Sequence, residues 1–375
     1  MKIAIIHYDD SLSPGGINTN IRETFLGLTK RGVEAHIIQP HRGGNSELSR
    51  NPNFHGLTCN NLKPPFNLSR TFIRELQSKL QQIKPDVVHV HSHMNLLSHS
   101  IIRSIRRNSP HQKVVFSPHF DIAISSRLAR PFFSLFNRTI GKSTLNRVDY
   151  LIFNSDFERN AYCRMVGGFS EQFKNIPPGI NLIGHEVEKV WDSELNILFY
   201  GHFVHRKRVD RALNLFRKIC DSPSLSDVKM RFIICGQGPE GDRIMKLSRL
   251  LNLENHVDWR PFLPREELLQ LITKANYTIL LSDSEAYGIS VAESLALGTP
   301  VIGSKLAALS EFQSTPGAFL FENPEDFDHI ARSISSHRGQ KIVIGPVGHN
   351  IISNEQSVEH HLSLYRTIIN ENHSI

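Results

Sequence analysis

The chain has 375 residues, a length that predicts two domains rather than a single core. Its composition, 39% hydrophobic and 21% charged, is typical of a soluble globular protein, and it has no apolar run long enough for a membrane span. Because residues 1–6 read directly as a strand, no secretory leader is expected. Four widely spaced cysteines argue against a disulfide framework or a zinc site and indicate a reducing, cytoplasmic setting. The net charge of +7 leaves three kinds of anionic partner open: nucleic acid, an anionic membrane and a phosphorylated small molecule.

The first half of the chain alternates short apolar runs with helical patterns. The apolar runs predict strands over residues 3–7, 33–39, 86–91, 113–116 and 148–153. Helices are predicted over residues 18–30 and 70–83, and residues 40–65, with their Gly, Asn and Pro, are expected to be mostly irregular. Strands separated by helices in this rhythm indicate a parallel, doubly wound sheet.

Residues 127–147 interleave basic and apolar side chains at roughly helical spacing. The cations are Arg127, Arg130, Arg138, Lys142 and Arg147. Two interpretations remain open: an ordinary helix that packs an apolar stripe on the first sheet, or a helix that lies on an anionic membrane surface.

The strand and helix rhythm starts again in the second half. Strands are predicted over residues 196–200, 231–235, 256–259, 277–281 and 300–303. Helices are predicted over 211–220, after Gly236-Gln-Gly-Pro-Glu240, and over 358–369. We therefore expect a first Rossmann-like domain over 1–178, a hinge over 179–192, a second such domain over 193–350 and a final helical segment over 351–375.

Two glutamates, Glu285 and Glu293, stand eight positions apart after the predicted strand 277–281. Eight residues are a little over two helical turns, so both carboxylates can face the amino end of a helix that starts between them. Loops at the carboxyl ends of parallel strands are where open α/β sheets bind ligands, and carboxylates accept strong hydrogen bonds from sugar hydroxyls. The alternative is that both glutamates are solvated surface residues.

Two loops suit phosphate groups. Gly15 and Gly16 lie between a strand and a helix, where the backbone can approach a phosphate or a sugar, although a plain tight turn is the alternative. The three spaced glycines of a dinucleotide site are absent, so no nicotinamide or flavin cofactor is predicted. Arg206, Lys207 and Arg208 follow the first strand of the second domain and can neutralise a diphosphate, unless they form a solvated turn.

Histidines supply a further set of candidates. His119, in Ser117-Pro-His-Phe-Asp121, stands at the carboxyl end of a strand, where it can position a substrate hydroxyl or serve a structural role. His89, His91 and His93 alternate along a strand, and three histidines on one face can bind a metal, but a chain with 20 histidines produces such clusters by chance. Asp326-Phe-Asp328 is interpreted as a helix start rather than a metal motif, and no metal site is predicted.

Taken in order, these segments resemble the family-4 glycosyltransferases over nearly the whole chain. The matching segments are Pro14-Gly15-Gly16, Asp86 to His91, Ser117 to Asp121, Asn154-Ser155, Pro177 to Ile180, Gly236 to Pro239, Arg260 to Phe262, and Glu285 to Glu293 with Gly298-Thr-Pro-Val behind it. The Glu-x7-Glu segment is the specific one. The resemblance implies the GT-B fold, two facing Rossmann-like domains with parallel sheets, and a C-terminal helix that crosses back to the first domain.

The resemblance also implies roles for individual residues. Glu285 would bind hydroxyls of the donor sugar, and Glu293 those of the ribose. The amides of Tyr287, Gly288 and Ile289 would meet the phosphates, with Lys207 holding the diphosphate. His119 would lie beside the reacting sugar, and Gly15 and Gly16 would form the glycine loop on the donor side.

The chain departs from the family pattern at two positions. The family usually has an arginine after the glycine at 201, whereas this chain has His202, so that Arg206 or Arg208 would have to replace the charge. A Gly-Gly pair is common before a glutamate after the last strand, whereas this chain has Ala307 and Ala308 before Glu311. Both departures weaken the assignments in the phosphate loops.

The sequence thus predicts a cytoplasmic, metal-independent, retaining glycosyltransferase without a cofactor. Its partners would be a UDP- or GDP-sugar and a hydroxyl acceptor that can be lipid-linked, with an anionic membrane surface as a further partner and no nucleic acid. Two alternatives remain: a sugar-nucleotide epimerase or hydrolase on the same fold, and a non-catalytic basic protein that binds a membrane or nucleic acid.

Overall fold

A computed structural model describes residues 1–8, 15–40, 50–59, 68–120, 130–168, 170–181, 186–345 and 350–371. The chain divides into two compact units, one formed by Met1–Gly179 together with the segment from Ser353 onward, and the other by Ile180–Ile352. The chain passes between them at β8 (Gly179–Ile180) and returns at β17 (Ile352–Ser353), and these two short strands pair with each other. The predicted α/β architecture with two parallel sheets is confirmed.

The first unit contains a seven-stranded sheet in the order β3-β2-β1-β4-β5-β6-β7, with parallel pairing throughout. Its strands are β1 (Lys2–Ile6), β2 (Glu34–Pro40), β3 (Phe54–Leu57), β4 (Val87–His91), β5 (Lys113–Ser117), β6 (Tyr150–Phe153) and β7 (Phe173–Asn175). Its helices are α1 (Gly16–Lys30), α2 (Arg70–Ile83), α3 (Leu96–Asn108), α4 (Arg130–Phe136), α5 (Lys142–Leu145), α6 (Asp156–Met165) and α12 (Asn354–Asn370).

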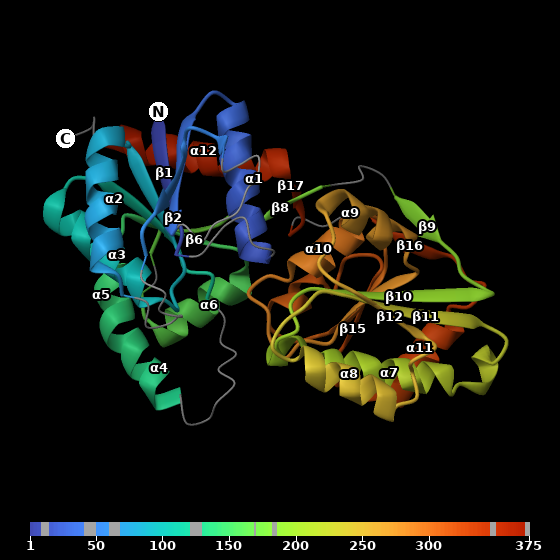
Figure 1. Ribbon diagram of the computed structural model, residues 1–375. Helices are drawn as coiled ribbons and strands as arrows, with labels where there is room; N and C mark the ends of the chain where they lie inside the picture. Colours follow the sequence, from blue (N-terminus) through green and yellow to red (C-terminus); the bar gives the residue numbers. More distant parts are fainter. Residues whose placement is uncertain are drawn as a thin grey trace. The chain divides into compact units, whose positions relative to one another are not determined.

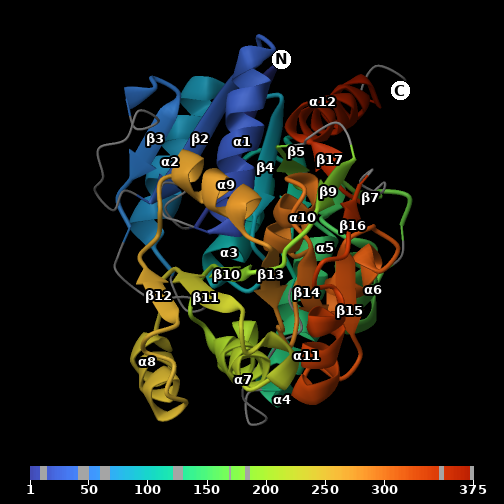
Figure 2. The same ribbon diagram turned by 90° about the vertical axis from the view of Figure 1, so that its right-hand side faces the viewer.

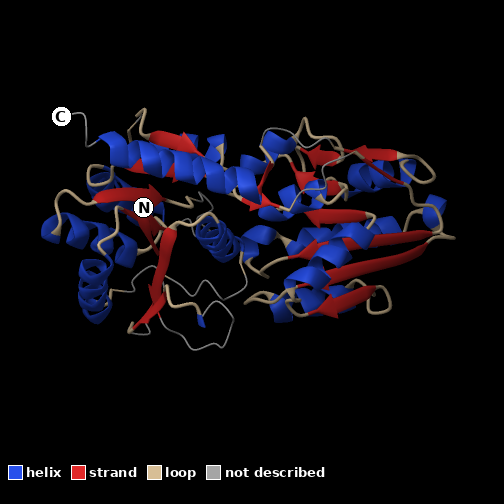
Figure 3. Cartoon of the chain, turned by 90° about the horizontal axis from the view of Figure 1, so that it is seen from above, coloured by secondary structure: helices blue, strands red, loops and turns tan. Residues whose placement is uncertain are grey.

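The C-terminal helix α12 belongs to the first unit. It is the long helix that precedes the C-terminus in Figure 3, and it lies beside α1 (Figure 1). Its Leu362 and Tyr365 are buried in the same core cluster as Ile3 of β1. The Tyr365 hydroxyl is 2.8 Å from Nδ1 of His89 in β4, and Ser353 begins the helix with a capping box. The other face of this sheet is covered by α2, α3 and α6, whose apolar residues form a second cluster.

The second unit contains a six-stranded parallel sheet in the order β12-β11-β10-β13-β14-β15. Its strands are β10 (Glu194–Tyr200), β11 (Lys229–Cys235), β12 (Val257–Arg260), β13 (Tyr277–Leu280), β14 (Val301–Ser304) and β15 (Ala318–Phe321). Its helices are α7 (Val209–Cys220), α8 (Gly241–Leu250), α9 (Arg265–Lys274), α10 (Ile289–Ala296) and α11 (Phe327–Ser336). Helices α7, α8 and α11 lie on one face of this sheet and α9 and α10 on the other (Figures 1 and 2).

In each sheet, the chain reverses its direction of winding beside the first strand. β10 leads through α7 to β11 on one side, whereas β13 leads through α10 to β14 on the other, so that the loops after β10 and β13 diverge. β1 and β4 have the same relation in the first unit. Ligands of doubly wound sheets bind at such switch points, at the carboxyl ends of the strands.

The structure differs from the sequence prediction at several elements. Residues 130–147 are not one helix: α4 is followed by a π-helical segment, Asn137–Gly141, and by α5, while residues 121–129 lie outside the described part of the chain. The predicted hinge includes β9 (Val187–Lys189), which pairs with β16 (Ile342–Ile344), and Trp191, which is buried in the core of the second unit. The edge strands β3, β7 and β15 were not predicted, because runs of only three or four residues give a weak periodic signal. Asp326 caps α11 as predicted for a helix start.

Candidate active site

The loops after β10 and β13 bring Lys207 and Arg206 to Glu285. Lys207 Nζ lies 2.7 Å from Glu285 Oε1, and the Arg206 guanidinium lies 3.1 Å from Oε2. Ser282 donates a third hydrogen bond, of 2.9 Å, to Oε1. The amide of Asp283 donates to the carbonyl of Arg206 at 2.9 Å, which joins the backbones of the two loops. Three of the predicted site residues therefore meet at the switch point of this sheet.

Glu285 is a buried carboxylate, with only 8% of its side chain exposed. Burial alone would raise its pKa, but the opposing charges of Lys207 and Arg206 lower the pKa below its ordinary value of 4.5. The carboxylate is therefore ionised at neutral pH. The side chain of Glu293 is 5% exposed, so the alternative of two solvated surface glutamates is wrong.

The turn between the two glutamates exposes backbone amides at the start of α10. Gly288 precedes the helix with φ 97°, and a Cβ at this position would lie 2.4 Å from Leu309 Cδ2, so that both conformation and packing require glycine. Among the residues that the structure describes, none accepts a hydrogen bond from the amides of Tyr287, Gly288 or Ile289. Unpaired amides at a helix start, together with the helix dipole, favour a phosphate. The Tyr287 side chain is held away from solvent by its hydrogen bond of 2.7 Å to the carbonyl of Asn350.

Glu293 has a cationic partner that the sequence did not suggest. Arg265, the first residue of α9, lies 2.6 Å from Glu293 Oε1. The hydroxyl of Tyr200, at the end of β10, is 3.3 Å from Oε2. The only signal in the sequence is a cation at the first position of a helix, where the dipole disfavours it.

Arg206 and Arg208, the two candidates to replace the arginine expected at position 202, have different partners in the structure. Arg208 forms ion pairs with Asp210, Asp283 and Glu325. Arg211 contacts the last two of these carboxylates, so Arg208 belongs to a separate network of charges. Arg206 is beside Glu285 instead. His202 packs edge to face against Phe262, with ring centroids 4.9 Å apart, and so lies next to the Arg260-Pro-Phe262 segment.

Ala307 occupies a left-handed conformation, with φ 53°, which favours glycine. The amide of the next residue, Ala308, donates to the carbonyl of Glu285 at 3.3 Å. The backbone at Ala307 therefore has the left-handed conformation that glycine adopts most easily. The loop that contains Ala307 and Ala308 contacts Glu285 through this hydrogen bond.

In the first unit, His119 lies in a chain of hydrogen-bonded polar groups at the switch point. His91 Nδ1 is 2.9 Å from His119 Nε2, and the Asn154 amide is 3.0 Å from His119 Nδ1. His7, at the end of β1, lies edge-on to His91 and is bonded to Asn18. Burial, with a smaller contribution from nearby His7, lowers the pKa of His119 to about 3, so that the ring is neutral at pH 7.

The glycine pair starts α1 in the same unit. Gly15 is the residue before the helix, with φ 154°, and its carbonyl accepts the amide of Thr19 at 2.9 Å. Gly16 is the first helical residue, while Pro14, Asp121 and Arg127 lie outside the described part of the chain. The predicted site residues thus divide into Gly15, Gly16 and His119 on the first unit and all the others on the second.

The three alternating histidines have separate partners. His89 bonds Tyr365 and Ser117, His91 bonds His119, and His93 is 2.9 Å from Asn137 Oδ1. Across the described residues, no three His, Cys, Asp or Glu side chains are grouped to hold a metal ion.

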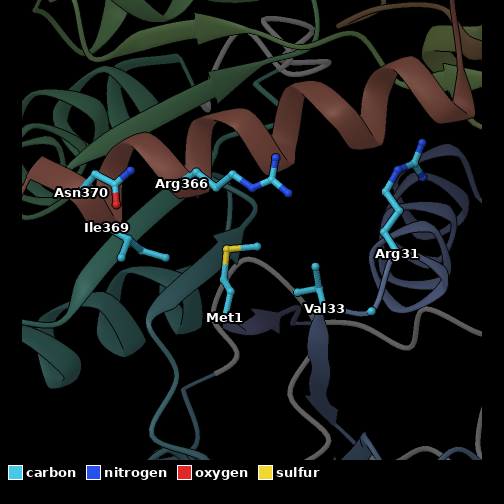
Figure 4. Close-up of a pocket in the computed structure, with 7 residues that line it drawn as sticks. Met1, Arg31, Val33, Arg366, Ile369 and Asn370 are labelled. Atoms are coloured by element: carbon cyan, nitrogen blue, oxygen red, sulfur yellow. The ribbon is translucent and has the colours of Figure 1, made fainter.

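A hollow of about 330 Å³ on the first unit lies at the opposite, amino-terminal edge of the sheet. Its lining includes Met1, Arg31, Val33 and Arg366 (Figure 4). Arg31 is already bonded to the carbonyl of Glu355 at 3.1 Å. The hollow contains none of the predicted site residues.

Comparison with known proteins assigns both halves of the chain to glycosyltransferase models. Residues 14–183 match the model Glycosyltransferase Family 4, and residues 185–337 match Glycosyl transferases group 1. The N-acetyl-alpha-D-glucosaminyl L-malate synthase of Bacillus anthracis is 24% identical, with 83% of this chain and 80% of that protein covered. The GDP-mannose-dependent alpha-(1-6)-phosphatidylinositol dimannoside mannosyltransferase of Mycobacterium tuberculosis is also 24% identical, over 70% and 68%. Among solved structures, the sucrose-phosphate synthase of Thermosynechococcus elongatus has the same fold, with a TM-score of 0.76, 20% identity and 99% of each chain covered.

Proposed function

This chain belongs to the family-4 glycosyltransferases of the GT-B fold, and from that premise we propose that it transfers a sugar from a nucleotide-diphosphate donor to a hydroxyl acceptor with retention and without a metal ion. One observation carries the proposal: Lys207 and Arg206 meet the buried Glu285 next to the free amides that start α10. Cations, amides and a carboxylate together suit a diphosphate joined to a sugar.

We assign the residues as follows. Lys207, Arg206 and the amides of residues 287–289 hold the diphosphate and stabilise its charge as it leaves. Glu285 accepts hydrogen bonds from hydroxyls of the donor sugar, and Glu293 from the ribose. The cations that bind the diphosphate already contact Glu285, so donor binding would place phosphate and carboxylate around the same two side chains.

In the first unit, we assign His119 to the reacting sugar and Gly15 and Gly16 to the adjoining loop. His119 is neutral and has hydrogen-bond partners at both ring nitrogens, so it suits a positioning role better than that of a charged acid. We infer that the leaving phosphate oxygen takes the acceptor proton on the face where the new bond forms. This route retains the configuration without a carboxylate nucleophile.

Two measurements test this proposal. A thermal-shift panel of UDP, GDP and their sugars identifies the donor, because a ligand at 100 times its Kd stabilises a protein by about 2.7 kcal/mol. Donor turnover is then followed in excess EDTA, and NMR assigns the configuration of the first-formed product. Loss of activity in EDTA with recovery on adding Mg²⁺ or Mn²⁺ would contradict metal independence, and an inverted product would contradict retention. Nucleotide release that no acceptor accelerates would favour a hydrolase or epimerase.

We further infer a cytoplasmic enzyme that binds an anionic membrane surface reversibly through α4 and the segment after it. Phe132 and Leu135 are 47% and 63% exposed, and Arg138 and Lys142 are exposed on the following turns. Apolar side chains that enter the headgroup region, flanked by cations, favour such a surface. None of the described helices is long and apolar enough to cross a bilayer. The mannosyltransferase relative is named for a phosphatidylinositol substrate, which supports a lipid-linked acceptor here.

A further inference from the structure

Arg265 stands where the helix itself would disfavour it. It is the first residue of α9, and the amino end of a helix carries partial positive charge, so acidic residues such as the following Glu266 and Glu267 are preferred there. The guanidinium forms an ion pair at 2.6 Å with the carboxylate of Glu293. Arg265 thus opposes the helix dipole, and its charge is paired with a residue of the proposed donor site. This combination suggests that Arg265 is kept for function rather than for helix stability.

The position of α9 is held by packing. Its Ile272, with Leu268 and Leu271, joins a core cluster that includes Tyr200 of β10. Lys189 donates to the carbonyls of Thr273 and Ala275 at the other end of the helix, at 2.6 Å each. Arg265 is thus presented to Glu293 by a helix that is fixed to the same strand from which Tyr200 approaches the carboxylate.

The carboxylate of Glu293 retains acceptor positions. Its two oxygens can accept about four hydrogen bonds. Arg265 occupies one position on Oε1, and Tyr200 faces Oε2 from 3.3 Å while its single proton has a nearer acceptor, the carbonyl of Ser290 at 2.7 Å. Within the described part of the chain, each oxygen therefore has room for one more donor, and two adjacent hydroxyls are what the 2′ and 3′ positions of a ribose provide.

We propose that Arg265 is a positioning residue that holds Glu293 so that both carboxylate oxygens accept from a ribose diol, and that it thereby sets the preference of this site for ribonucleoside over 2′-deoxyribonucleoside diphosphates. The inference rests on the proposed function, in which Glu293 binds the ribose. Without the guanidinium, the buried carboxylate of Glu293 loses the ion pair that fixes its orientation, and its two oxygens are no longer held toward the ribose.

The test uses isothermal titration of the full chain with UDP, GDP and ADP and with the 2′-deoxy form of each. Wild type is expected to bind its preferred ribonucleotide about tenfold or more tightly than the deoxy form, since a hydrogen bond to a charged group is lost. In Arg265→Met, the deoxyribonucleotide should bind no more than about threefold more weakly than the ribonucleotide. Arg265→Lys, which keeps the charge, should retain most of the ratio. Arg217→Met, which breaks an exposed ion pair with Asp221 on α7 of the same unit, is the matched control and should leave the ratio unchanged.

The outcomes separate this inference from the proposed function. Wild type that binds none of the three diphosphates at millimolar concentration would overturn the proposed function itself. Binding with no preference for the ribonucleotide would remove the role of Glu293 and the inference with it. If Arg265→Met still binds the nucleotide and prefers the ribonucleotide over the deoxy form as strongly as wild type does, only the inference is overturned. If that variant does not fold, Arg265→Gln, which keeps one N–H donor and loses the charge, decides the question by the same ratio.

Discussion

Glu285 and Glu293 carry the same charge eight positions apart, but their surroundings differ. Glu285 faces two cations at the carboxyl ends of β10 and β13, whereas Glu293 lies within α10 against Arg265. We expect the Gln variants to differ accordingly. Glu293→Gln should weaken UDP or GDP binding by about 1.5–3 kcal/mol, the usual loss for a hydrogen bond to a charged group. Glu285→Gln should lower turnover while the diphosphate affinity changes little.

Titration calorimetry with the diphosphate and steady-state kinetics with the sugar nucleotide separate the two effects. Glu254→Gln, an exposed glutamate of the same unit, is the control for loss of a negative charge. Equal loss of diphosphate affinity in both site variants would contradict this division of roles.

At the scale of elements, the turn before α10 depends on a glycine that is constrained in two ways. Gly288→Ala should destabilise the second unit by about 2–4 kcal/mol, because a left-handed alanine costs roughly 1–2 kcal/mol and overpacking against Leu309 adds a similar amount. Gly339→Ala has a similar backbone angle, φ 69°, but nothing within 4 Å of the added methyl, so it should show the conformational cost alone. Urea unfolding followed by tryptophan fluorescence measures both, and equal losses in the two variants would exclude the steric contribution.

The α4 surface provides a second prediction at this scale. Wild type should sediment with anionic vesicles at low salt, and Phe132→Ser with Leu135→Ser should reduce sedimentation, because these side chains supply the exposed apolar area. Arg138→Glu with Lys142→Glu should abolish it, since each cation near an anionic surface contributes about 1 kcal/mol. Leu250→Ser, at an 81% exposed leucine on α8, is the control for loss of exposed apolar area elsewhere. Wild type that remains in solution would leave α4 as an ordinary surface helix.

At the scale of the whole molecule, buried histidines are concentrated in the first unit. Burial lowers the pKa of His93 and His119 to about 3 and of His99 and His361 to about 4, and it holds the pKa values of His89 and His91 well below 6.5. The unfolded chain binds these protons below pH 6.5, whereas the folded unit does not. Stability contributed by the neutral rings is therefore complete above pH 6.5 and is lost as the pH falls toward 4, by up to about 1.4 kcal/mol per pH unit for each ring.

The distribution of tryptophans allows each unit to be followed. Trp191 and Trp259 both lie in the second unit, so their fluorescence reports its unfolding, whereas far-UV circular dichroism reports both units. Between pH 7 and pH 5, the urea midpoint seen by circular dichroism should fall, with an early phase that the fluorescence does not follow. If the circular dichroism and fluorescence transitions coincide and their urea midpoints do not change between pH 7 and pH 5, the buried histidines do not contribute to stability as proposed.

The sequence by itself determined the two parallel sheets and the position of the Glu-x7-Glu segment. Both follow from local patterns: apolar runs alternate with helical patterns, and residues 282–288 must come after a buried strand. The sequence also placed Lys207 and Glu285 in loops at the carboxyl ends of strands. It did not identify their contact, because contact depends on β10 and β13 being neighbours although they are the first and fourth strands of their sheet.

Only the tertiary structure decided which charges pair. Arg206 and Arg208 are two positions apart, yet one contacts Glu285 and the other a network with Asp210 and Asp283, because a tight turn points their side chains in different directions. The pairing of Arg265 with Glu293 joins residues 28 positions apart on separate helices. Such contacts arise from the strand order and from the packing of helices on the sheet, which local periodicity does not encode. Composition and pattern therefore sufficed for the fold class, whereas the edge strands and the charge arrangement of the site required the folded chain.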